Sequence, residues 1–212
     1  LIRKILHVGV PNGLENGMFQ LGKILVLSLV TSFGTASIAA NAVSNNIAMF
    51  AVLPGMSIGF AMLTVSAQCV GAGDFEQVKY YTKKLMKLTY ICLILMNILV
   101  VLLLPFIIKV YGLSAEASEY ARRILIYHSC CVVTIWPLSF SLANTLRDVK
   151  YTMILAIVSM WTFRIGFSYI LGSYLKWGVF GIWVAMTIDW LFRSICFIIR
   201  YLGGKWKHAS LV

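Results

Sequence analysis

Apolar residues fall into six long runs along this chain, separated by short polar or basic segments. About 20 helical residues cross a bilayer core of about 30 Å, so each run can make one crossing. The runs predict helices over about 11–33, 38–70, 88–108, 124–146, 151–171 and 179–201. Pro11 suits the first position of the first helix. "LPG" at 53–55 and Pro137 predict bends inside the second and fourth helices.

Composition narrows the class of protein. Of the 212 residues, 60% are hydrophobic and 12% are charged, whereas a soluble domain carries about 25% charged residues. The chain is therefore predicted to be an all-α, polytopic membrane protein with no separate soluble domain. Its five cysteines form no CxxC pair and indicate neither a disulfide framework nor a metal site. The first residues form no signal peptide, and the start at Leu1 leads us to expect a piece of something longer.

Lysine and arginine predict the orientation in the membrane, because cytoplasmic loops carry an excess of both. With the N-terminus inside, eleven basic residues fall on the inner segments and four on the outer ones. Both termini are therefore expected to be cytoplasmic, in the cell membrane. The segment 71–87, "GAGDFEQVKYYTKKLMK", is then a basic cytoplasmic connection, read most simply as an interfacial helix on anionic headgroups.

Ionisable residues inside the apolar runs need a partner or water. Asp189 and Arg193 are four apart in the last helix, so they lie on one face and are expected to pair. Arg164, in the fifth helix, either pairs with Asp189 across helices or extends along its own stem toward the interface. His128, near the outer end of the fourth helix, is expected to be solvated or hydrogen-bonded.

The first helix is different, because its polar residues form a continuous stripe. At 100° per residue, Asn12, Asn16, Gln20 and Lys23 cluster on one face, with Glu15 to one side. Such a stripe is expected to face a water-filled cavity or the inside of a bundle. The eight-residue separation of Glu15 from Lys23, about 12 Å along the axis, argues against one tight salt bridge and leaves the carboxylate available for another cation.

The second helix supplies a possible opposite wall. Asn41, Ser44 and Asn45 recur at spacings of three and four among small alanines, which suits either helix–helix hydrogen bonds or a cavity lining. Trp136 and Asn144 in the fourth helix are weaker candidates for the same wall, and a tryptophan beside a bend also fits plain packing. The sequence has no HExxH, GxSxG or nucleotide-binding loop and no paired aspartates at catalytic spacing, so we do not expect an enzyme.

These patterns resemble a known family over residues 1 to 207. The stretches that carry the resemblance to the seventh and eighth helices of the multidrug and toxic compound extrusion (MATE) family are "VPNGLENGMFQLGKILV" and "IAANAVSNNIAMFAVLPGMSIGFAMLTVSAQCVGAGD". Those that resemble its tenth to twelfth helices are "PLSFSLANTLRDVKYTM", "SMWTFRIGFSYILG" and "WGVFGIWVAMTIDWLFR". The resemblance implies twelve helices in two six-helix lobes, of which residues 1–212 would be the C-terminal lobe.

The resemblance also implies a function. Such transporters use a sodium or proton gradient, with no bound cofactor, to export organic and often cationic compounds by rocking their lobes. Glu15 falls where several members carry a cation-binding glutamate, and Asn41 where many have histidine or asparagine. Trp136 stands where some members have an aspartate, and Asp148 follows Arg147 directly where members often have a spacer. The first departure argues against a two-carboxylate site in the C-terminal lobe and leaves open a main ion site in an N-terminal lobe.

The sequence therefore predicts a cation-coupled antiporter. Glu15 is expected to bind the coupling cation, and the substrate cavity is expected to be lined by Asn12, Asn16, Gln20, Asn41, Asn45 and Trp136. Its expected partners are a small organic molecule, the lipid bilayer, and either an N-terminal lobe or a second copy, but no nucleic acid. Two alternatives remain: a flippase for lipid-linked oligosaccharides, which would need a large basic cavity, and a non-transporting membrane scaffold.

Overall fold

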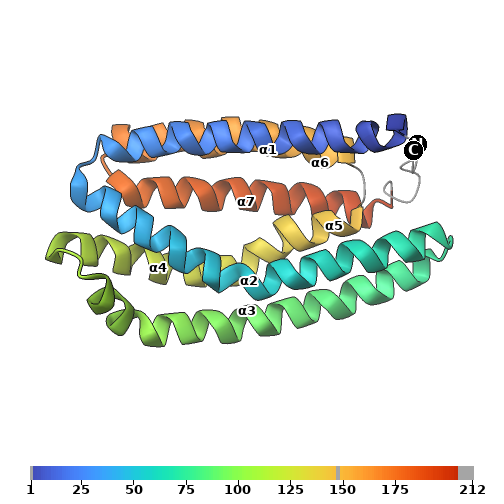
Figure 1. The fold of residues 1–212 in the computed structure, drawn as a ribbon, viewed down its shortest axis with the longest axis horizontal. Helices are drawn as coiled ribbons and strands as arrows, with labels where there is room; N and C mark the ends of the chain where they lie inside the picture. Colours follow the sequence, from blue (N-terminus) through green and yellow to red (C-terminus); the bar gives the residue numbers. More distant parts are fainter. Residues whose placement is uncertain (1, 147–148, 205–212) are drawn as a thin grey trace.

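The computed structural model describes residues 2–146 and 149–204, and for residues 2–8, 11, 12, 15, 149 and 150 it describes the backbone alone. Within these residues the fold is a bundle of helices (Figure 1). Three of the segments, marked η, are π-helical, so their turns are wider than those of an α-helix. The elements are α1 Ile2–Thr31, α2 Thr35–Gly71, α3 Phe75–Tyr111, α4 Ala115–Trp136, η1 Pro137–Ser141, α5 Leu142–Leu146, α6 Val149–Ser159, η2 Met160–Gly166, η3 Ser168–Tyr174 and α7 Gly178–Leu202.

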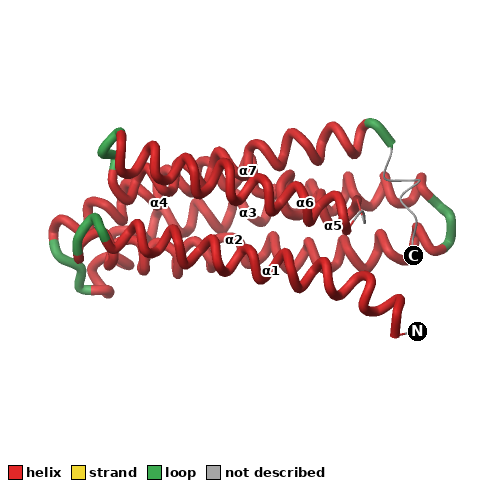
Figure 2. Tube along the Cα trace, turned by 90° about the horizontal axis from the view of Figure 1, so that it is seen from above, coloured by secondary structure: helices red, strands yellow, loops and turns green. Residues whose placement is uncertain are grey.

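These elements form six rods along the long axis of the molecule. The segments α4, η1 and α5 make one continuous rod, and α6, η2 and η3 make another. Within the described chain, five rods are long and apolar enough to cross a membrane, and α1 contributes a shorter apolar stretch, Asn16–Thr31. The turns 32–34, 112–114 and 175–177 gather at one end, and the turn 72–74 lies at the other end with the start of α1 and the end of α7 (Figures 1 and 2).

Several helices begin earlier than the sequence predicts. Asp74 caps α3 by accepting a hydrogen bond from the backbone N–H of Gln77 (3.0 Å), so the helix starts at Phe75. The segment 71–87 is therefore not a separate helix but a short turn followed by the first turns of α3. Ser114 caps α4 in the same way, through the N–H of Ala117 (3.3 Å). The first helix begins at Ile2 instead of near Pro11.

The two prolines expected to bend helices have different effects. The helix α2 continues through Pro54 and bends near its middle (Figure 1). Pro137 opens η1, where the rod changes direction between α4 and α5 (Figure 1). The two regions touch, because a Cβ at Gly55 would lie 2.6 Å from Cζ3 of Trp136. A glycine after Pro54 thus lets α2 approach the Trp136 ring closely.

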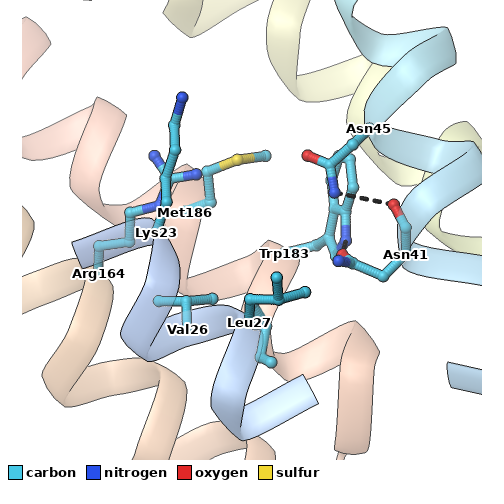
Figure 3. A pocket seen from close by; sticks show the side chains of 9 residues that line it. Lys23, Val26, Leu27, Asn41, Asn45, Arg164, Trp183 and Met186 are labelled. Carbon is cyan, nitrogen blue, oxygen red and sulfur yellow. Dashed lines mark hydrogen bonds between the residues drawn. The ribbon is translucent and has the colours of Figure 1, made fainter. Parts of the chain in front are cut away.

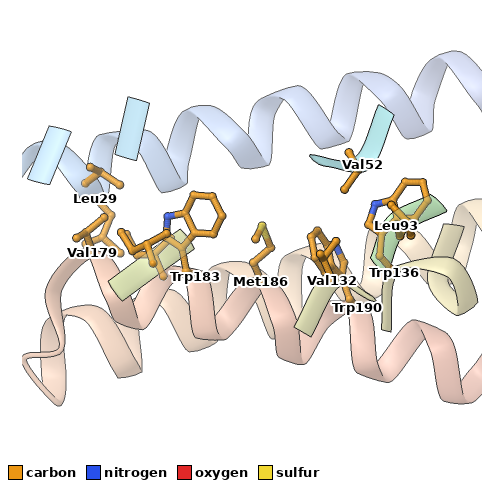
Figure 4. Close-up of a cluster of buried hydrophobic side chains, with 12 residues drawn as sticks. Leu29, Val52, Leu93, Val132, Trp136, Val179, Trp183, Met186 and Trp190 are labelled. Carbon is orange, nitrogen blue, oxygen red and sulfur yellow. The ribbon is translucent and has the colours of Figure 1, made fainter. Parts of the chain in front are cut away.

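The main core lies along α7, which packs against α4, η2 and η3. Trp136, Trp183 and Trp190 are its largest side chains (Figure 4). Aliphatic residues from α1, α2 and α3 close over them, including Leu29, Val52 and Leu93 (Figure 4). Because lipid is as apolar as leucine, this association depends on close packing and on polar contacts between helices more than on hydrophobicity.

Candidate binding cavity

A cavity of about 240 Å³ opens between α1, α2, η2 and α7 (Figure 3). Asn41, the seventh residue of α2, lies about 9 Å from the start of that helix at 1.5 Å per residue, which places the cavity in the half of the bundle near the turn 32–34. Its walls combine basic, amide, aromatic and aliphatic groups. The lining residues are Lys23, Val26, Leu27, Asn41, Asn45, Arg164, Ile182, Trp183 and Met186.

The amide wall is held by hydrogen bonds. Asn41 is 9% exposed, and its Oδ1 accepts a hydrogen bond from Nε1 of Trp183 (3.1 Å), which ties α2 to α7. Asn45 donates from Nδ2 to the backbone carbonyl of Asn41 (2.8 Å). Asn41 thus combines both roles that the sequence leaves open, a bond between helices and a cavity lining, whereas Asn45 lines the cavity and bonds within α2.

The basic wall is formed by Lys23 of α1 and Arg164 of η2, which line the cavity on the side away from Asn41 and Asn45 (Figure 3). Arg164 extends toward Asp189, with 4.0 Å between Nη1 and Oδ2. Of the two alternatives for Arg164, the structure favours the contact across helices. The side chain nevertheless retains 15% exposure, toward the cavity that it lines.

Behind this wall lies a buried ion pair. Asp189 is fully buried and accepts hydrogen bonds from Nε and Nη2 of Arg193, both 3.0 Å long. The predicted pairing of these two residues is confirmed. Ser159 donates to the same carboxylate, a partner that the sequence gives no reason to choose, and the Phe19 ring lies 4.7 Å from Cζ of Arg193. Two hydrogen bonds, a hydroxyl and an aromatic face replace water around this pair.

The predicted stripe on α1 reaches this cavity through Lys23. Asn16 and Gln20 are exposed on α1 and do not belong to the lining. Asn12 and Glu15 fall within α1, but their side chains lie outside what the structure describes. The expected roles of these four residues remain predictions.

Two residues of the fourth predicted helix lie away from the cavity. Trp136 is 5% exposed and stacks on Phe140, with 5.1 Å between ring centroids, so the structure places it in the core. Asn144 donates to the backbone carbonyl of Gly59 (3.1 Å), which joins α5 to α2.

His128 corrects the expectation of a solvated histidine. It is 3% exposed and lies edge-on between Trp183 and Trp190, at 5.3 and 5.7 Å between ring centroids. The long rod α4 begins nine residues before the predicted helix, so His128 lies well inside the bundle instead of near a helix end. Burial between two indoles makes it part of the core.

Sequence reasoning missed Trp183 and Met186 as cavity residues. The spacing of three and four in Trp183, Met186 and Trp190 puts them on one face of α7, which is the pattern of a core helix. Only the neighbouring helices decide which part of that face meets a cavity. Within the residues that the structure describes, no group of three His, Cys, Asp or Glu side chains is arranged to hold a metal ion.

Comparisons with known proteins agree on the family. The family model described as MatE matches residues 11–170. The chain is 25% identical over 221 residues to the probable multidrug resistance protein YoeA of Bacillus subtilis, with 100% of this chain and 46% of that protein covered. It is 22% identical over 217 residues to the probable multidrug resistance protein NorM of Thermotoga maritima, with coverage of 99% and 46%.

Solved structures agree on the fold. A crystal structure of a MATE protein in the bent conformation matches with a TM-score of 0.86 at 17% identity, over 99% of this chain and 47% of that one. The outward-facing conformation of a multidrug resistance MATE family transporter matches with a TM-score of 0.84 at 17% identity, over 97% and 47%. The chain thus spans about half the length of the relatives it matches.

Proposed function

This chain belongs to the MatE family of transporters, and we propose that it forms one lobe of a cation-coupled antiporter that exports organic compounds by alternating access. The observation that carries the proposal is the cavity between α1, α2, η2 and α7, where a basic and an amide wall lie in a bundle of otherwise apolar helices. Polar groups at membrane depth are expensive and typically mark a pathway for a substrate or an ion. The relatives described as multidrug resistance proteins support export as the direction and organic compounds as the cargo.

In this proposal Glu15 is the coupling residue. A carboxylate that loses water favours its neutral form, so binding of a proton or of sodium would stabilise Glu15 within the bundle. Release of that cation would restore the charge and favour the other orientation of the lobes. Asn12, Asn16 and Gln20 on the same helix would keep the path to Glu15 hydrated.

The proposed orientation has both termini in the cytoplasm of a cell membrane. Its support is the excess of basic residues on the segments at the end where α1 starts, together with the three turns gathered at the opposite end (Figure 2). The cavity then lies in the outer half of the membrane, on the side where an exporter releases its substrate. An N-terminal lobe, or a second copy of this chain, would complete the transport path.

The test is Glu15→Gln in the natural protein, with efflux of a fluorescent zwitterionic fluoroquinolone measured from loaded cells under an imposed proton or sodium gradient. We expect the gradient-driven rate to fall at least tenfold, because a neutral amide cannot exchange a cation. Glu119→Gln is the matched control, since Glu119 is an exposed carboxylate near the start of α4. Undiminished efflux in Glu15→Gln would overturn the proposal, and the gradient that drives the wild type identifies the coupling ion.

A flippase for lipid-linked sugars is the second candidate, and the basic wall of Lys23 and Arg164 favours it. Such a substrate carries a diphosphate that two cations suit well. The two candidates differ in what the purified protein binds. Specific binding of a lipid-linked disaccharide diphosphate, with no efflux of any soluble compound, would favour the flippase.

A further inference from the structure

Charge is unevenly distributed inside the bundle. Four acidic residues with described side chains lie near helix ends: Asp74, Glu76, Glu116 and Glu119. Among the described side chains, this leaves Asp189 as the carboxylate in the interior. Three cationic side chains, those of Lys23, Arg164 and Arg193, lie at or behind the same cavity.

Asp189 does not balance these three charges. Its oxygens accept two hydrogen bonds from Arg193 and one from Ser159, and the carboxylate is fully buried. Arg164 approaches it only to 4.0 Å, and Lys23 lies on the opposite helix, α1. The described cluster therefore carries a net charge of about +2 at membrane depth, with Arg164 and Arg193 largely buried and Lys23 exposed at the mouth of the cavity.

The remaining walls of the cavity define the rest of a ligand. Val26, Leu27, Ile182 and Met186 are apolar, and the Trp183 ring is fixed by its hydrogen bond to Asn41. A volume of about 240 Å³ holds about eight waters at ~30 Å³ each, which is less than a typical drug pocket of about 300 Å³ or more. The space suits a compact molecule with one charged end and one flat apolar end.

We propose that this cavity binds a small organic anion, with its carboxylate at Lys23 and Arg164 and its flat apolar body against Trp183 and Met186. The guanidinium plane matches a carboxylate, and the lysine ammonium adds a second charged donor. A cation is disfavoured by like charge, and a neutral ligand would leave the net positive charge of the cluster uncompensated. The proposal rests on the proposed export function and specifies its substrate as an anion or a zwitterion, in contrast to the cationic substrates that the resemblance implies.

The experiment measures equilibrium binding of radiolabelled 2-naphthoate to the natural protein in an uncharged detergent. Its matched cation, 2-naphthylmethylammonium, has the same ring and the opposite charge. Lys23→Met keeps the length of the side chain and removes its charge, and we expect it to weaken naphthoate binding about tenfold, the loss of one charged hydrogen bond. Lys109→Met is the control, because Lys109 is an exposed lysine near the end of α3 and outside the cavity.

Three results would overturn the proposal. Equal naphthoate affinity in Lys23→Met and Lys109→Met would show that the anion does not bind in this cavity. Binding of the naphthyl cation as tightly as the anion would contradict the role of charge. Displacement of naphthoate by a few mole per cent of phosphatidylglycerol, but not by the zwitterionic phosphatidylcholine, would reassign the site from a small molecule to a lipid headgroup.

Failure of this inference is distinct from failure of the proposed function. Naphthoate binding needs no ion gradient, so it is measured independently of efflux. Undiminished efflux in Glu15→Gln together with naphthoate binding would reject the coupling role of Glu15 and keep the anion site. Conversely, efflux that depends on Glu15 without any naphthoate binding would preserve the antiporter and reject the anion site.

Discussion

Replacement of Asp189 by asparagine tests the electrostatic reasoning most directly. The amide keeps the size of the side chain and removes its charge. Asp189 is fully buried and accepts two 3.0 Å hydrogen bonds from Arg193. Its Oδ2 also lies 4.0 Å from Nη1 of Arg164. At an effective dielectric constant of about 20, two opposite unit charges about 4 Å apart attract each other by about 4 kcal/mol. Because removal of one partner from a buried pair costs about 3–5 kcal/mol, we expect a destabilisation in that range.

The assay is unfolding of the natural protein in dodecyl maltoside, followed by circular dichroism during a denaturant titration. Glu119→Gln is the matched control, because Glu119 pairs with Arg123 (2.7 Å) at the same spacing of four residues. Both side chains of that pair are at least half exposed, 50% for Glu119 and 68% for Arg123, so we expect a loss of about 0.5 kcal/mol or less.

A second variant separates charge from shape. Arg193→Met added to Asp189→Asn removes one of the two unpaired guanidinium groups, and part of the lost stability should return. The reasoning is refuted if Asp189→Asn and Glu119→Gln lower the unfolding free energy equally. It is also refuted if Arg193→Met makes Asp189→Asn less stable still, because the pair would then matter through packing and not through charge.

Two further predictions concern packing and hydrogen bonding, both read from the same unfolding assay. Gly181→Ala should destabilise by about 1–3 kcal/mol, because its Cβ would lie 2.7 Å from the backbone carbon of Leu171, and Gly166→Ala, where a Cβ meets nothing within 4 Å, should cost less. Trp183→Phe should cost about 1 kcal/mol more than Trp190→Phe, because Trp183 donates to Asn41 while Nε1 of Trp190 finds no partner among the described residues. Equal losses within either pair would contradict the corresponding contact.

Hydropathy alone is enough to predict the class of fold, because a helix that crosses a bilayer must satisfy its backbone internally and must be apolar over about 20 residues. The predicted second and sixth helices, 38–70 and 179–201, differ from α2 and α7 by three residues or fewer at either end. The early starts of α3 and α4 also have a local signal. Asp74 and Ser114 are residue types that commonly cap helices. They lie outside the apolar runs, so a prediction based on hydropathy alone does not include them.

The order of residues along the chain is enough to identify which buried charges need a partner. Asp189 and Arg193 are one turn apart on one helix, so their pairing follows from local geometry. The packing of the helices determines that Ser159 donates to Asp189, that Trp183 donates to Asn41, and that Lys23 and Arg164 line one cavity. These contacts join residues up to 142 positions apart, and their formation depends on how rods of similar apolar character rotate against one another, which no pattern within a single helix specifies.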